Sequence, residues 1–332
     1  KMRKYLVISN DLINIDKNQI STDNNDTINI ISAIQKKFEI YLYSRPSKLK
    51  NIFNISIDKK INRINLFDLF NFSKIDILMI SITPRNFIFL LIARMVLKNL
   101  KGYVLLRSNG HKEYQSKFGK IGFFLYDLMF NYITKKLKII SVSKNIIKKK
   151  NVKYLFPSEL DNDWFKKIKK INNKIPRLLY FGRFRKEKGI YSLLTLAENF
   201  YLKFCLTMAG DTKIIPTKND NIKILGKISN KKKIISLYDN HNMLILPSYT
   251  EGSPKVIIES LARMRPVIVF NEIKHVKSNF YGVYVCKRNV NSLEKTIKYI
   301  IKNYSKVQIS MKKNDLYTKK KFQSNLLNIL NE

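Results

Sequence analysis

Short apolar runs alternate with helix-length amphipathic segments along this chain of 332 residues. Residues 243–246 are all apolar, and a run of this length is typical of a buried strand in a parallel sheet. Pro247 ends the run because proline cannot donate to a sheet ladder. Apolar residues then recur at helical spacing between 256 and 262, and another apolar run covers 267–270. The pattern predicts a βαβ unit, which places the loop 248–253 at the carboxyl end of a parallel sheet, where open α/β folds bind ligands.

The start of the predicted helix carries the first candidate chemistry. Ser253 can cap a helix and Pro254 fits the first helical position. The free N–H groups of a helix that begins there favour an anionic or hydroxyl-rich ligand. Glu251 precedes this start, and Glu259 falls in the second turn where an apolar face would otherwise continue. Two solvated glutamates are the common alternative, but the insert that begins at Gly252 favours a functional pair.

A basic turn follows the apolar run 178–181. Gly182 permits a sharp turn, and Arg183 and Lys188 then flank the start of another predicted helix. An arginine offers a bidentate fork to phosphate oxygens, whereas a lysine offers a point charge. In so basic a chain a solvated loop is the alternative, and the order of strand, Gly-Arg, Lys-Gly and helix favours phosphate binding.

Composition bounds the class of protein. The chain is 45% hydrophobic and 12% aromatic, which excludes a disordered protein, and its length suffices for two domains. Its formal charge of +39 predicts attraction to anionic ligands and surfaces. Cys205 and Cys286 lie in apolar runs and are interpreted as buried hydrophobes in a reducing, cytoplasmic setting. The longest apolar stretch, Phe87–Ala93, is too short to cross a bilayer, so any membrane contact is expected to be peripheral.

The segment 119–138 mixes aromatic and basic residues and has two interpretations. It fits an amphipathic helix that lies on a membrane interface. Such faces more often belong to a core, so we expect most of it to be buried. The lysines are then expected to form a solvated rim, which comprises Lys117, Lys120, Lys135, Lys136 and Lys138.

The run Glu-Gly-x-Pro-x-x-x-x-Glu from Glu251 to Glu259, after Leu-Pro-Ser, resembles the signature of the family 4 retaining glycosyltransferases of the GT-B fold. The resemblance implies that Glu251 lies near the donor sugar and that Glu259 binds the ribose of the nucleotide. The loop implied to hold the donor sugar comprises Gly252, Ser253, Pro254 and Lys255. Met264 departs from the usual small residue or glycine, which we interpret as a packing variation.

Further residues take implied roles from the same resemblance. Arg183 and Lys188 would clamp the donor diphosphate, and the segment that ends at Ile228 would hold the base through backbone groups. His111 would face the donor sugar from the other domain, the alternative being a loop histidine without a task. The glycine-rich loop that usually follows the first strand, here expected at Tyr5–Ser9, has no counterpart.

The resemblance also implies the architecture, an α/β GT-B fold of two Rossmann-like domains that face each other across a cleft. We expect an acceptor-side domain over residues 1–165, a charged linker at 166–174 and a nucleotide-sugar-binding domain over 175–305. Residues 306–332 are expected to form a helix that crosses back to the first domain, with 307–330 helical. No metal or other cofactor is expected beside the nucleotide diphosphate sugar.

The implied activity is the retaining, metal-independent transfer of a hexosyl unit from a nucleotide diphosphate sugar to a glycan or lipid-linked glycan. We expect it to serve bacterial O-antigen, lipopolysaccharide or capsule synthesis, in the cytoplasm and at an anionic membrane surface on its inner face. Two alternatives stay open. The charge fits a nucleic-acid-binding module, although the lysines are dispersed and only Gly119–Gly122 resembles an RNA-binding loop. The missing glycine-rich loop fits a nucleoside-diphosphate-binding scaffold without transfer activity.

Overall fold

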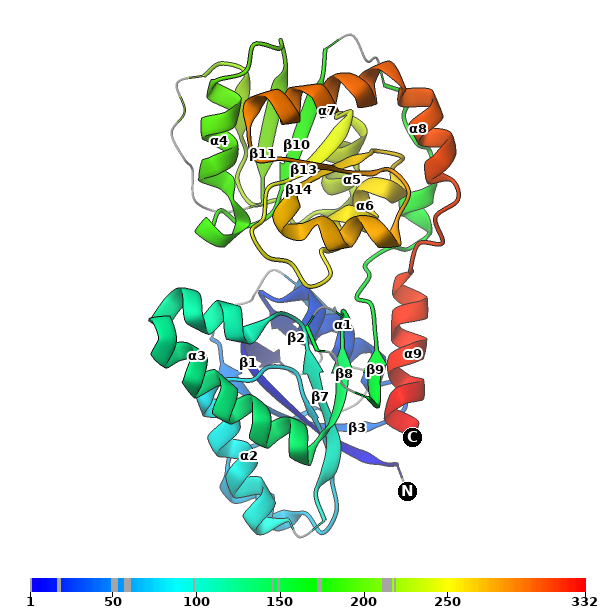
Figure 1. The fold of residues 1–332 in the computed structure, drawn as a ribbon. Coiled ribbons are helices and arrows are strands. Elements are labelled where there is room, and N and C mark those ends of the chain that lie inside the picture. The colour runs from blue at the N-terminus through cyan, green and yellow to red at the C-terminus, as the bar shows by residue number, and fades with distance from the viewer. Residues whose placement is uncertain are drawn as a thin grey trace. The chain divides into compact units, whose positions relative to one another are not determined.

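The computed structural model describes residues 2–16, 19–48, 53–56, 61–97, 99–144, 146–147, 150–171, 175–210, 217 and 219–332. The chain divides into two compact units (Figure 1), the first made of Lys1–Pro157 with Lys320–Glu332 and the second of Ser158–Lys319. Each unit has a largely parallel sheet covered by helices, which confirms the predicted α/β fold with two Rossmann-like units. The last part of the predicted linker, 172–174, lies outside the described residues.

The sheet of the first unit has the order β4-β2-β1-β6-β7-β8-β9, with β3 also paired to β1 and β5 to β3. Its pairs are parallel except β1–β2 and β2–β4. Its strands are β1 Lys4–Asp16, β2 Gln19–Thr22, β3 Glu39–Pro46, β4 Phe53–Ser56, β5 Asn62–Arg63, β6 Asp76–Met79, β7 Lys101–Leu106, β8 Lys138–Ser141 and β9 Val152–Tyr154. Its helices are α1 Asn25–Ile34, the 3-10 helix η1 Phe67–Asn71, α2 Pro84–Val96, α3 Gly110–Lys136 and α9 Lys319–Asn331.

Alternate side chains of β1 enter the two layers on either side of this sheet. Leu6 and Ile8 belong to the core cluster that α2 and α3 complete. On the other face, the Tyr5 hydroxyl donates to the carbonyl of Leu330 on α9 at 2.6 Å, and Lys36 Nζ donates to Gln323 of α9 at 3.0 Å. Helix α9 is therefore a structural layer of the first unit (Figure 1).

The first strand is longer than the expected Tyr5–Ser9. β1 continues to Asp16 and pairs antiparallel with β2. The carboxylate of Asp11 accepts hydrogen bonds from Ser9 Oγ at 3.0 Å and from Asn24 Nδ2 at 3.2 Å, so polar side chains are satisfied within the strand and its neighbours. A β-hairpin thus stands where the resembled family has its glycine-rich loop.

The sheet of the second unit is parallel throughout, in the order β12-β11-β10-β13-β14-β15. Its strands are β10 Arg177–Phe181, β11 Cys205–Ala209, β12 Ile222–Ile224, β13 Met243–Leu246, β14 Val267–Phe270 and β15 Val283–Cys286. Its α-helices are α4 Ile190–Glu198, α5 Lys231–Asp239, α6 Lys255–Ala262, α7 Val290–Lys302 and α8 Tyr304–Met311. Its 3-10 helices are η2 Asn162–Phe165, η3 Lys186–Lys188 and η4 Asn271–Asn279.

The strand order of this sheet locates its ligand crevice. From β10 the chain moves outward to β12, then returns to the other side of β10 and moves outward again from β13 to β15. The direction reverses between β10 and β13. The helices that follow these two strands, α4 and α6, pack on opposite faces of the sheet, which places a ligand crevice at the carboxyl ends of the strands. Helices α4 and α7 complete the core on one face, and α5, α6 and α8 complete it on the other.

The boundary between the units falls before Ser158, so the predicted end of the first domain at 165 is too late. Trp164 is 3% exposed and belongs to a core cluster of the second unit. The buried guanidinium of Arg263 donates to the carbonyls of Trp164 at 3.0 Å and Lys166 at 2.8 Å, while it pairs with Asp239 at 2.6 Å. These contacts attach the segment to the second unit.

The expected helix 307–330 is two helices, α8 and α9, separated by residues 312–318. Asn314 stabilises the break, because its side chain accepts from Tyr281 N at 2.8 Å and donates to Tyr281 O at 2.9 Å. The chain leaves the second unit only after this interruption.

Two smaller expectations also need correction. Cys205 begins β11 and is exposed, whereas Cys286 is buried as expected, and burial raises the pKa of its thiol to about 12. Met264 has a φ of 57° at the end of α6, a left-handed conformation that glycine adopts without strain. The usual glycine at this position therefore has a backbone reason, and Met264 is more than a packing variation.

Candidate functional site

A glycine follows each of three neighbouring strands of the second unit, β10, β11 and β12, and the backbones come close together at these glycines. Gly182 N, after β10, donates to Ala209 O at 2.9 Å, and Gly210 N, after β11, donates to Gly226 O at 3.3 Å. A side chain at Gly210 would begin only 2.9 Å from Gly182 N. The carboxyl edge of the sheet is therefore lined here by main chain, which suits recognition through backbone groups.

The loops after β10 and β13 meet through a pair of predicted site residues. Lys188 Nζ lies 2.7 Å from Glu251 Oε1, and the side chains are only 22% and 10% exposed. The fully buried Ser248 donates its hydroxyl to the same oxygen at 2.7 Å. A charge-assisted hydrogen bond of this length fixes both groups. The sequence assigned Lys188 and Glu251 to different turns, and the structure brings them together at the point where the strand order reverses.

The backbones of the same two loops are in direct contact. Gly189 has a φ of 68° and precedes α4 as its cap. A Cβ atom at this position would lie 1.9 Å from Pro247 O, so no other residue fits without a shift of the backbone. Tyr249 N donates to Glu187 O at 3.0 Å, which ties the loops again.

Arg288 joins this contact and is a residue that the sequence analysis missed. Its guanidinium donates to Pro247 O at 2.9 Å, to Ser192 Oγ at 3.2 Å and to Glu272 at 2.7 Å. It also stacks on Tyr249, with 4.2 Å from Cζ to the ring centroid. Its place just after β15, at the same edge of the sheet, is the signal that could have found it.

We expect Glu272→Gln to lower the free energy of unfolding by about 1 kcal/mol at neutral pH, a value that allows for a side chain one-third exposed to solvent. The hydrogen bond from Arg288 holds the pKa of the Glu272 carboxyl below its usual range. Its stabilisation is therefore complete above the unfolded pKa of about 4.3 and is lost as pH falls through the lower folded value. Denaturant unfolding at several pH values should show the difference from the unsubstituted protein shrinking below about pH 4.

Glu187→Gln is the matched control, since Glu187 lies 4.0 Å from Arg185 and both side chains are well exposed. It should change the unfolding free energy by less than about 0.5 kcal/mol at every pH. A constant difference for Glu272→Gln across the acid range would contradict the depressed pKa.

Glu259 is buried on α6, and the Tyr238 hydroxyl donates to its Oε2 at 2.9 Å. Burial raises the pKa of Tyr238 well above its usual value, and the charge of Glu259 adds to this effect, so the phenol stays a donor. The Tyr238 ring contacts Phe181, the last residue of β10, at 6.1 Å between centroids. Glu259 is thus held through Tyr238 beside the carboxyl end of β10, and no pattern in the sequence indicated this tyrosine.

The remaining predicted residues of the second unit follow β10, β12 and β13 along the chain. Arg183 follows Gly182 and is exposed, and its carbonyl accepts from the Tyr180 hydroxyl at 2.7 Å. Ile228 is half-buried in the segment after β12. Lys255, the first residue of α6, pairs with Glu159 at 3.0 Å.

The start of α6 differs by one residue from the expectation. Pro254 has a ψ of 112° and takes the cap position, so the helix begins at Lys255 and Ser253 does not cap it. Gly252 and Ser253 remain in the irregular loop after β13. The loop is therefore slightly longer than predicted, and its place at the carboxyl end of β13 is unchanged.

His111 belongs to the first unit and lies in the first turn of α3, so the alternative of a loop histidine does not hold. Its Nε2 is 3.0 Å from Asp127 Oδ1, and its ring centroid is 4.8 Å from that of Tyr126 and 4.9 Å from that of Phe130. These partners hold the imidazole within α3. Its role toward a donor sugar stays a prediction, because Glu251 belongs to the other unit.

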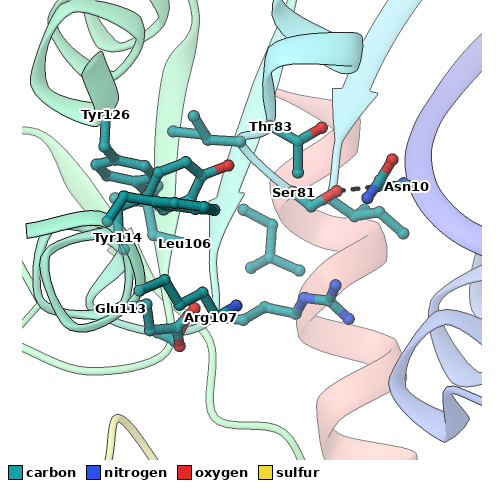
Figure 2. A pocket seen from close by; sticks show the side chains of 15 residues that line it. Asn10, Ser81, Thr83, Leu106, Arg107, Glu113, Tyr114 and Tyr126 are labelled. Carbon is teal, nitrogen blue, oxygen red and sulfur yellow. Dashed lines mark hydrogen bonds between the residues drawn. The ribbon is translucent and has the colours of Figure 1, made fainter. Parts of the chain in front are cut away.

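The first unit has a cavity of its own, about 380 Å³ in volume, at the carboxyl ends of β6 and β7. Figure 2 shows Tyr114 and Tyr126 together on one side and Ser81 and Asn10 on the other. The cavity has mixed chemistry, since hydroxyl, amide and charged groups lie beside aromatic rings. Its polar lining comes from Asn10, Ser81, Thr83, Arg107, Ser108, Glu113 and Lys117, and its aromatic lining from Tyr114, Phe118 and Tyr126.

Within the described ranges, no three His, Cys, Asp or Glu side chains gather as ligands for a metal ion. No helix in the same part of the chain is long and apolar enough to span a bilayer.

Residues 161–316 match the family model of the group 1 glycosyl transferases. The matched segment covers most of the second unit, including the loops that carry Lys188, Glu251 and Glu259. This part of the chain therefore has the sequence pattern of that group.

The chain is also similar in sequence to a bacterial glycosyltransferase and in fold to several solved structures. It is 26% identical over 200 residues to the capsular polysaccharide biosynthesis glycosyltransferase CapM of Staphylococcus aureus, a match over 52% of each chain. The match thus spans about half the length of that relative. Two solved structures are similar in fold, Anabaena Alr3699/HepE in complex with UDP-glucose and the sucrose-phosphate synthase of Thermosynechococcus elongatus. The first has a TM-score of 0.69 at 11% identity and covers 99% of both chains, and the second has 0.67 at 13% and covers 99% of this chain and 95% of the other. These likenesses establish the GT-B fold.

Proposed function

We propose that this protein is a family 4 retaining glycosyltransferase that moves a hexosyl unit from a nucleotide diphosphate sugar to a glycan or lipid-linked glycan. The observation that carries the proposal is the pairing of Lys188 with Glu251 at the point where the strand order of the second unit reverses. A nucleotide-sized ligand is favoured at that edge of the sheet. The family pattern over residues 161–316 supports the reaction class.

The side chains around this edge suit the two ends of a nucleotide sugar. Arg183 and Lys188 are the cations for the diphosphate, and their charge stabilises the leaving group as the glycosidic bond breaks. We therefore propose metal-independent transfer. Glu259, buried and oriented by Tyr238, is the acceptor of the ribose hydroxyls. The backbone of the segment that ends at Ile228 is the contact for the base, beside the glycine edge.

Glu251 and the loop from Gly252 to Lys255 are the contacts for the transferred sugar. The bond between the anomeric carbon and the diphosphate oxygen breaks, and the acceptor oxygen bonds to the same face of that carbon. The acceptor proton passes to the departing phosphate oxygen. His111 of the first unit remains a candidate contact to the sugar.

The acceptor belongs to the synthesis of bacterial surface polysaccharides in this proposal. The similarity to a capsular polysaccharide glycosyltransferase supports this class, which also includes O-antigen and lipopolysaccharide. The net charge of +39 favours peripheral binding of the enzyme to an anionic membrane surface on the cytoplasmic side. The cavity of the first unit is the site proposed for the acceptor glycan.

A thermal unfolding panel with uridine, guanosine and thymidine diphosphates tests the proposal. One of the three should raise the unfolding midpoint, because a ligand that binds the folded state stabilises it by mass action. Glu259→Gln should weaken that nucleotide about tenfold, through the loss of one charged hydrogen-bond acceptor for the ribose. The matched control is Glu294→Gln, a buried glutamate on α7 that accepts from Tyr201 N and Leu202 N and should leave nucleotide affinity unchanged.

The outcomes separate the candidate functions. Binding with consumption of the corresponding sugar donor supports transfer. Binding without turnover on any glycan acceptor supports the scaffold alternative, which the β-hairpin in place of a glycine-rich loop favours. No stabilisation by any of the three nucleotides, or equal weakening in both variants, would remove the proposed site.

A further inference from the structure

Helix α3 is bent at Gly119, which has a φ of 63° and a ψ of −150°. The two helical parts pack closely on either side of the bend. A Cβ atom at Gly110 would lie 2.0 Å from the Tyr126 ring, and one at Gly122 would lie 2.4 Å from Tyr114 O. The bend therefore forms a fixed corner of the first unit, and we call residues Lys117–Leu128 the α3 corner.

The α3 corner exposes a cluster of large apolar side chains, contrary to the expectation that this segment belongs mostly to the core. Ile121 is 73% exposed and Phe124 is 62% exposed. The other exposed members are Phe118, Phe123, Leu125 and Leu128. Beneath them, Tyr126 and Met129 face inward and belong to the core of the unit. A cluster of this size exposed to water indicates a surface that another body covers.

The charges around the cluster indicate what covers it. Residues 114–126 contain no Asp or Glu, whereas Lys117 and Lys120 are both exposed on either side of Gly119. The carboxylate that follows this stretch, Asp127, already bonds His111 at 3.0 Å and Asn131 at 2.8 Å. Apolar side chains beside two lysines match a bilayer with anionic headgroups, where the rings enter the boundary and the amines meet phosphates.

The corner is continuous with the cavity of the first unit. Lys117 and Phe118 belong to the corner and also line the cavity beside Tyr114. A bilayer that binds the α3 corner would therefore have its headgroups at the opening of the cavity. An acceptor with a lipid portion could keep that portion in the bilayer while its glycan enters the cavity.

We infer that the α3 corner binds an anionic lipid bilayer and presents the cavity to a lipid-linked glycan. This inference rests on the proposed function for its acceptor, and on the exposed residues of α3 for its surface. It names the occupant as a bilayer, so a second copy of the chain or another protein is an outcome that would contradict it.

Vesicle sedimentation tests the inference on the full chain. We expect binding to vesicles of phosphatidylcholine mixed with phosphatidylglycerol, and little binding to phosphatidylcholine alone. The double variant Ile121→Ser with Phe124→Ser should weaken binding about tenfold or more, because two buried apolar contacts are lost. Lys120→Gln should weaken it about fivefold, the effect of one lysine near an anionic surface. Lys120 is an exposed charge, so this variant tests the surface even where the double variant fails to fold.

The matched control removes two exposed phenylalanines elsewhere in the first unit, Phe67→Ser with Phe70→Ser on η1, which are 82% and 72% exposed. It should bind vesicles as the unsubstituted protein does. Equal loss in the control, no loss in either corner variant, or a dimer by light scattering that only the corner variants dissociate would overturn the inference. The nucleotide-induced shift in unfolding midpoint should be the same in all variants. If no nucleotide raises the unfolding midpoint of the unsubstituted protein, the proposed function fails. Vesicle sedimentation still tests whether the α3 corner binds a bilayer.

Discussion

Lys188→Gln should lower the rate of glycosyl transfer by about 10²–10³-fold, because it removes a cation preorganised at the leaving diphosphate. It also removes the 2.7 Å partner of Glu251, so the sugar-side carboxylate loses the contact that fixes it across the two loops. Initial rates of donor consumption, measured with sugar donors of the nucleotide that the unfolding panel selects, report this loss. Most of it should appear in the turnover number, since the developing charge exists mainly in the transition state.

Lys186→Gln is the control for Lys188→Gln, because it removes the same charge from an exposed position of the same 3-10 helix. It should change the rate less than about twofold, the scale of a screened surface charge. Comparable losses in the two variants would mean that the overall charge of the loop, not the Lys188–Glu251 pair, acts on the donor.

Gly189→Ala should lower the free energy of unfolding by about 3 kcal/mol or more and abolish nucleotide binding. The added methyl group would lie 1.9 Å from Pro247 O, in a backbone with a φ of 68°, so both loops must move. Because the two loops carry Lys188 and Glu251, their movement should disrupt the nucleotide site. Denaturant unfolding and the nucleotide-induced shift measure the two effects.

Gly226→Ala provides the stability control, since no atom lies within 4 Å of a Cβ atom placed there. It should change the unfolding free energy by about 0.5 kcal/mol at most. A Gly189→Ala protein as stable as this control, with nucleotide binding intact, would show that the contact between the two loops is not needed.

The regular parts of the second unit were predictable because its strands are buried on both faces. The apolar runs 243–246 and 267–270 coincide with β13 and β14. Helical and strand periodicities are strong where one unbroken face meets a core. The loops after β10 and β13 followed from these boundaries and from their turn residues.

The contacts between loops were not predictable in the same way. Arg288 donates to Pro247, 41 positions away, and Tyr238 donates to Glu259, 21 positions away. No local pattern in the sequence indicates such partners. The exposure of the α3 corner was missed for a related reason. Periodicity shows that a helix has an apolar face, but not whether protein or another surface covers it. In α3 the bend at Gly119 turns part of that face away from the core.

The discontinuity of the first unit has a consequence for how the chain folds as it is made. Helix α9 covers one face of the first sheet, yet the ribosome adds it only after the whole second unit. Until then, apolar positions such as Tyr5 lack this cover. The first unit therefore cannot complete its fold until the second unit has been synthesised. Domains usually fold in the order of synthesis. Here the nascent protein should acquire protease resistance in the second unit before the first.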